Sequence, residues 1–149
     1  MQKPSGNELR IRQSFADQAA ACAAFGSPFT ARLVNALGHA LDHDTQTGRR
    51  VLGWQGDTGH GGDALALRLA GALHSMVRRA RVPDLARHYP PNGLPEPETL
   101  RAAALDAIAR HDAEVAAFLD HAPQTNEVGR SAVLYPGFAV IAAETGLPL

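Results

Sequence analysis

Apolar residues recur every three or four positions through most of the chain, a spacing typical of helices that bury one face. The first such segment runs from about Glu8 to Phe25, with an apolar stripe of Ile11, Phe15, Ala19, Cys22 and Ala23. Ser5 precedes Glu8 at capping-box spacing, and Asn7 is an alternative N-cap. Gly26 suits the left-handed position that ends a helix, so both ends of this helix are predicted.

A second periodic segment follows at once, from Pro28 to about His43. Ser27 is the expected N-cap, and Pro28 belongs in a first turn, where its missing N–H does no harm. The face of this helix is defined by apolar residues every fourth position, namely Phe29, Leu33, Leu37 and Leu41. Because the connection is short, the first two helices should pack together as a hairpin or a corner.

The middle of the chain alternates weak and strong patterns. A short helical turn is predicted at residues 49–52, and the glycine-rich run 53–62 follows it. Asp63 then caps a third helix whose apolar face is too wide for a surface helix, so this helix should lie at the centre of the fold. A brief helix is expected within residues 83–89, before a proline-rich break.

Two further helical segments complete the pattern. The fourth helix should run from Pro97 toward His121, with an interruption near His111. The last segment, from about Glu127 to Thr145, is apolar on nearly every side, and Pro136 inside it predicts a kink or a fresh helix start. The sequence therefore predicts an all-α, compact helical bundle of about five to six helices, in one domain spanning residues 1–149.

Composition narrows the possible functions. A chain of 149 residues can bury a core of its own, and a formal net charge of −1 gives no field able to gather nucleic acid. No apolar run approaches the roughly 20 residues of a membrane span, and the amino-terminal residues do not have the pattern of a secretory signal. The single cysteine, Cys22, cannot form an intrachain disulfide. We therefore expect a cytoplasmic protein that binds neither nucleic acid nor membranes.

The histidines raise the question of a metal or catalytic site. His39 and His43 lie four residues apart on one helical face, and His60 is a possible third zinc ligand. Because three or four ligands must converge, a metal-dependent enzyme using these residues is the weaker alternative, and no metal or cofactor is expected in this chain. His74 and His111 interrupt apolar faces, where an imidazole serves either as a general base or as a hydrogen-bonded packing residue.

Two other features have ordinary explanations. The glycine-rich run 53–62 has neither the spacing of a Walker loop nor that of a dinucleotide-binding loop, so we interpret it as a flexible loop. A group of arginines follows the third helix, where it either holds an anion or forms a solvated helix end: Arg78, Arg79, Arg81 and Arg87.

The densest polar chemistry lies at residues 123–131, Pro-Gln-Thr-Asn-Glu-Val-Gly-Arg-Ser, between two apolar segments. In a structural interpretation, Asn126 caps the last helix, Glu127 favours the positive end of its dipole and Arg130 pairs with a carboxylate. In a functional interpretation, Gln124, Asn126, Glu127 and Arg130 bind a small anionic ligand at the helix N-terminus. Both interpretations stay open, and no catalytic residue is assigned.

Four segments together resemble a known family: Cys22 with Gly26-Ser27-Pro28, residues 66–74, residues 123–132 and residues 145–149. They are similar to the N-terminal portion of the bacterial domain-of-unknown-function family numbered 2332, which has no established activity. Its members continue into a strand and a glycine turn similar to those of S-adenosylmethionine-dependent methyltransferases. The resemblance implies an accessory or substrate-recognition region of a methyltransferase-like protein, with any cofactor site in residues that this chain does not have.

The apolar last segment bears on association. One of its faces should need a partner beyond the preceding helices. That partner is either a following domain or a second copy of the chain, in a two-fold homodimer through Leu134, Phe138 and Ile141. The alternative to an accessory region is therefore a self-contained interaction or dimerisation module.

Overall fold

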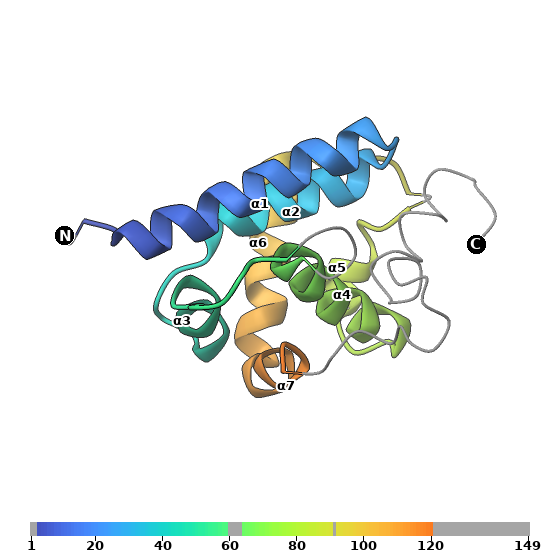
Figure 1. Cartoon of the computed structure of the whole chain (residues 1–149). Coiled ribbons are helices and arrows are strands. Elements are labelled where there is room, and N and C mark those ends of the chain that lie inside the picture. The colour runs from blue at the N-terminus through green and yellow to red at the C-terminus, as the bar shows by residue number, and fades with distance from the viewer. Residues whose placement is uncertain (1–2, 60–63, 91, 121–149) are drawn as a thin grey trace, which may run out of the picture.

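The computed structural model describes residues 3–59, 64–90 and 92–120, which contain seven α-helices and no strand (Figure 1). The helices are α1 (Gly6–Ala24), α2 (Pro28–Ala40), α3 (Gln46–Leu52), α4 (Leu65–Arg78), α5 (Pro83–Ala86), α6 (Pro97–Arg110) and α7 (Asp112–Phe118). The predicted all-α fold is confirmed for this part of the chain. Six of the seven helices have seven residues or more, which agrees with the predicted number, and the seventh, α5, has four.

The α1–α2 hairpin runs along the top of Figure 1, and these two helices share the most extensive helix–helix contact. Its ends follow the predicted signals. The Ser5 side chain accepts a hydrogen bond from the Glu8 backbone N–H at 3.0 Å, and Gly26 has a φ of 85°. The left-handed position that only glycine adopts at little cost therefore sets the turn between the helices.

The second helix ends three residues earlier than predicted, at Ala40, because Leu41 is extended and buried. Arg12 on α1 occupies the position beyond this end. Its guanidinium donates to the carbonyl oxygens of Gly38 and Leu41, at 2.9 and 2.8 Å, and it also pairs with Glu8 at 2.7 Å. A cation near the negative end of the α2 dipole stabilises that end, and it also joins α1 to α2.

The helix predicted to be central is α4, which contacts α1, α2, α5, α6 and α7. Nine of its 14 residues are buried, among them Leu69 and Leu73, which are fully inaccessible. Its N-cap position is held by Ala64 and not by Asp63. The first turn is supported by the preceding loop, since the Leu65 N–H donates to the carbonyl oxygen of Thr58 at 2.7 Å.

The predicted interruption near His111 is confirmed, and it aims Asp112 at another helix. His111 has φ −126° and ψ 33°, which ends α6 and starts α7. The Asp112 carboxylate accepts hydrogen bonds from the backbone N–H groups of Gln46 and Thr47, at 2.7 and 2.8 Å. Asp112 thus caps the N-terminus of α3 from 65 residues away, although Thr45 supplies a local cap as well.

A continuous apolar cluster holds the helices together and contains buried side chains from all seven of them. Phe15, Phe29, Leu37, Leu100 and Ile108 are among its largest fully buried members. In Figure 1, α6 connects the level of the hairpin to that of α7. Within the described ranges, no helix is both long and apolar enough to cross a bilayer.

Candidate functional site

The residues predicted to bind a ligand, Gln124, Asn126, Glu127 and Arg130, lie outside the described residues. The predicted dimer contacts lie outside them as well: Leu134, Phe138 and Ile141. Those assignments therefore stay predictions. The described part of the chain offers a different candidate, at the place where the first turn of α2 and the α4 helix meet the residues after α5.

Two polar side chains, His74 and Tyr89, stack there, and a third, Ser27, lies two residues before Phe29, whose ring packs on Tyr89. We refer to Ser27, His74 and Tyr89 as the Tyr89 cluster. Tyr89 is at its centre: its ring lies 4.5 Å from the ring of Phe29 on α2 and 5.9 Å from the imidazole of His74 on α4. The imidazole and the phenol are stacked, with 20° between their planes. Ser27 is fully buried at the start of α2, two residues before Phe29.

Each member of the Tyr89 cluster has a buried polar atom without a hydrogen-bond partner among the described residues: Ser27 Oγ, His74 Nδ1 and Tyr89 Oη. Buried polar atoms are nearly always paired in folded proteins, and leaving one unpaired costs about 1–3 kcal/mol. Three such atoms, of which those of His74 and Tyr89 belong to stacked rings, are therefore unusual in the described structure.

Burial also determines the charge of the cluster. Loss of solvent lowers the pKa of His74 to about 4, with a further contribution from Arg78 one turn along α4. The same loss of solvent raises the pKa of the Tyr89 phenol well above its usual range. At neutral pH the cluster therefore presents an uncharged imidazole, a phenol and a hydroxyl. Groups of this kind bind by donating or accepting hydrogen bonds rather than by attracting opposite charge.

The sequence identified this cluster only in part. His74 is a candidate from the sequence because it interrupts an apolar face, and Ser27 is the predicted N-cap of α2. Ser27 does occupy the N-cap position, but its ψ of 72° leaves the hydroxyl without a capping hydrogen bond, whereas Ser5 caps α1 with a ψ of 165°. Tyr89 has no sequence signal that identifies it, because a tyrosine before two prolines gives no sign of burial.

Ser27 and His74 lie in two of the segments that resemble a known family, and a family model tests that resemblance. The model described as "Uncharacterized protein conserved in bacteria (DUF2332)" matches residues 12–149. The chain belongs to DUF2332. Neither a comparison with curated proteins nor one with solved structures finds a match.

The histidine pair of this DUF2332 chain does not converge on one point. His39 Nδ1 lies 3.0 Å from the backbone oxygen of Asn35, and His43 Nε2 lies 2.9 Å from Glu8 Oε1. His60 lies outside the described residues. Within the part of the chain that the structure describes, no group of three or more His, Cys, Asp or Glu residues is arranged to hold a metal ion.

The remaining candidates have structural partners. His111 Nδ1 lies 3.4 Å from Glu114 Oε1, and the Asp112 carboxylate accepts hydrogen bonds from the N-terminus of α3. His111 and Asp112 therefore do not form a histidine–carboxylate general base. In the arginine group, Arg81 pairs with Glu114 and Arg87 with Asp84. In this DUF2332 chain, Asp112 and Arg81 thus join separate segments of the fold, whereas His111 and Arg87 pair within one helical turn.

Proposed function

We propose that this chain is an accessory, ligand-recognition domain of a methyltransferase-like protein, and that the Tyr89 cluster contacts the ligand. One observation carries this proposal: His74 and Tyr89 stack on each other, and each has a buried polar atom without a partner among the described residues, as does Ser27 at the start of α2. The methyl-transfer chemistry and its cofactor would belong to another part of such a protein, so this chain would not be catalytic alone.

The energetic cost of the cluster supports recognition over a structural role. Domains of this size are stabilised by only about 5–15 kcal/mol, and an unpaired buried polar atom costs about 1–3 kcal/mol. Side chains that served only stability would be better replaced by apolar residues of the same shape, such as phenylalanine at Tyr89. Natural sequences depart from that rule chiefly at functional sites.

The chemistry of the cluster indicates the kind of group that it recognises. A phenol and a hydroxyl both donate hydrogen bonds readily, and the uncharged imidazole donates or accepts. A ligand oxygen, from a carbonyl, carboxylate or phosphate group, fits these donors. In this proposal the remaining contacts come from Gln124, Asn126, Glu127 and Arg130, and Arg130 neutralises the charge of a small anionic ligand.

A thermal-shift screen tests the proposal, with carboxylates, amides, nucleotides and S-adenosylmethionine measured on the wild-type chain and on the Tyr89→Phe variant. A ligand of the cluster should raise the melting temperature of the wild-type chain and have little effect on the variant, since a ligand stabilises the state to which it binds. Ligands that stabilise both forms equally bind elsewhere. If every stabilising compound behaves in this second way, the proposal is wrong.

The alternative, a self-contained interaction module, is favoured by one exposed side chain. Phe25, at the end of α1, is 78% exposed, and large exposed apolar residues are enriched in contacts between proteins. Sedimentation equilibrium at micromolar concentration, with Phe25→Glu and Phe138→Glu as variants, tests this alternative. A dimer that either variant dissociates would support it, and a monomer unaffected by both would exclude dimerisation through these side chains.

A further inference from the structure

A surface pocket of about 650 Å³, the α1–α2 pocket, lies between α1, α2 and the residues around the start of α6. Its α1 wall consists of alanines, of which Ala16, Ala20 and Ala23 follow one another at the four- and three-residue spacing of a single helix face. Seven residues of helix rise about 10 Å, so this wall is smooth and apolar over two turns. The volume lies within the range of about 300–1,000 Å³ that small-molecule sites occupy.

The rest of the lining of the α1–α2 pocket carries two guanidinium groups, those of Arg32 and Arg101, and one carboxylate, that of Glu98. Arg32 on α2 is partly buried and is held in place by a 2.7 Å hydrogen bond from Nη1 to the backbone oxygen of Pro95. Within the described part of the chain, no carboxylate pairs with it. Arg101 on α6 approaches a carboxylate only at 3.9 Å, where Nη2 faces Oε2 of the solvent-exposed Glu98. A long, exposed pair of this kind contributes little.

These features together define the chemistry of an occupant. The alanine wall favours an apolar body, because it has neither charge nor hydrogen-bonding side chains. The guanidinium of Arg32 still has unused N–H donors in the planar fork that binds a carboxylate through two hydrogen bonds. Its bond to Pro95 fixes the side chain before any ligand arrives, which reduces the entropy lost on binding.

We infer that the α1–α2 pocket binds a small carboxylate with an apolar body. The carboxylate pairs with Arg32, close to Arg101, and the apolar body lies along Ala16, Ala20 and Ala23. This site is separate from the Tyr89 cluster and does not depend on the function proposed for it.

Isothermal titration calorimetry on the whole chain tests the inference with octanoate as the probe. Octanamide, which has the same apolar chain without the charge, is the matched control, and inorganic phosphate is the control for charge alone. We expect octanoate to bind at least tenfold more tightly than either, a ratio that corresponds to about 1.4 kcal/mol. Equal binding of octanoate and octanamide would show that the arginines take no part, and it would overturn the inference.

Two variants locate the site. Arg32→Gln should weaken octanoate binding at least tenfold, because it removes a charge-assisted pair. Ala20→Leu should abolish binding by filling the pocket, whereas Ala24→Leu, also on the exposed surface of α1 but outside the pocket, should leave the affinity unchanged. Leucine, like alanine, is a good helix former, so both alanine variants should fold. These two variants therefore still test the inference if Arg32→Gln proves unstable.

Further results also test whether octanoate binds in the α1–α2 pocket. Tyr89→Phe should leave the octanoate affinity unchanged, so failure of the function proposed above and failure of this inference are distinguishable. An octanoate affinity unaffected by Arg32→Gln, or lowered equally by Ala20→Leu and Ala24→Leu, contradicts the inference. So does sedimentation that shows a dimer dissociated by Ala20→Leu, because a second copy would then fill the pocket.

Discussion

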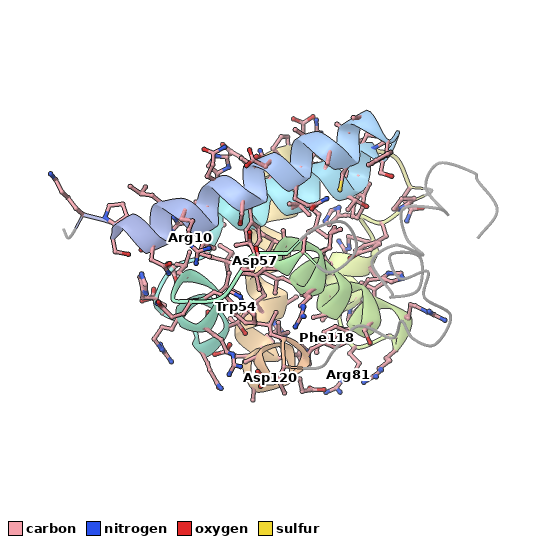
Figure 2. The ribbon with its side chains drawn as sticks, in the orientation of Figure 1. Arg10, Trp54, Asp57, Arg81, Phe118 and Asp120 are labelled. Atoms are coloured by element: carbon pink, nitrogen blue, oxygen red, sulfur yellow. The ribbon has the colours of Figure 1, made fainter. Side chains whose placement is uncertain are left out.

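Two polar regions of this domain differ in how completely their hydrogen bonds are made. Near α3, Asn7 on α1 donates to the carbonyl oxygen of Leu52 at 3.1 Å. Arg10, one turn further along α1, donates to the carbonyl oxygen of Trp54 at 2.8 Å, and these two residues lie close together in Figure 2. On the other side of α3, Asp112 accepts from two backbone N–H groups. In the Tyr89 cluster, by contrast, three buried atoms have no partner among the described residues.

The difference separates polar groups that hold the fold together from polar groups that the fold merely accommodates. Around α3, side chains satisfy the free backbone groups at both helix ends, which a helix of seven residues cannot satisfy internally. In the Tyr89 cluster the polar atoms contribute nothing to the ligand-free fold. Substitutions that remove a polar group should therefore lower the free energy of unfolding around α3 and raise it in the Tyr89 cluster.

The largest effect should come from Asp112→Ala, which we expect to lower the free energy of unfolding by about 2–3 kcal/mol. The change leaves the Gln46 and Thr47 N–H groups without the charged acceptor that joins α3 to α7, and hydrogen bonds to charged groups contribute about 1.5–3 kcal/mol. Urea denaturation measures the change. Asp106→Ala, which removes only an exposed pair with Arg110, is the control and should cost under about 1 kcal/mol.

In the Tyr89 cluster, Tyr89→Phe should raise the free energy of unfolding of the ligand-free chain by about 1–2 kcal/mol. Phenylalanine keeps the packing against Phe29 and His74 and removes a hydroxyl that is buried without a partner. The same urea experiment measures it. A destabilised variant would mean that the hydroxyl is paired in the free domain, and the contrast between the two regions would disappear.

The smallest effect concerns pH, where the two regions should respond in different windows. The folded pKa of His74, about 4, lies below its unfolded value of about 6.5, so the unfolded chain binds the proton more readily. His74 therefore contributes full stability above pH 6.5 and loses it as the pH falls toward 4. We expect a loss of about 1 kcal/mol, reduced from the full linkage value because the side chain is partly exposed.

Near α1 and α3, hydrogen bonds from His43 and Arg12 lower the pKa of Glu8. Burial raises the pKa of Asp112, but the hydrogen bonds from Thr47 and Gln46 outweigh it and leave that pKa below its usual value. These carboxylates contribute stability above their unfolded pKa values of about 4 and lose it only at lower pH. Urea midpoints between pH 7 and 3 should show both windows. His74→Phe should flatten only the upper window, and Glu8→Gln only the lower one.

Sequence patterns predicted those features that depend on residues close together in the chain. The faces of α1, α2 and α4 follow from apolar spacing, and the turn at Gly26 and the break at His111 follow from local signals. The predicted end of α2 was wrong for a related reason: Leu41 continues the apolar period of α2, yet it lies beyond the end of that helix. A periodic pattern records that a side chain is buried, not which backbone conformation buries it.

By itself, the sequence determined the helical class, the centrality of α4 and the family to which the chain belongs, because each of these rests on the order and spacing of residues. Tertiary structure alone decided what each polar residue does. Asp112 became a cap for α3, Ser27 lost its expected cap role, and Tyr89 joined His74 in an unpaired cluster. The pairing of a polar atom depends on neighbours that are distant in the chain, and packing rather than local preference chooses those neighbours.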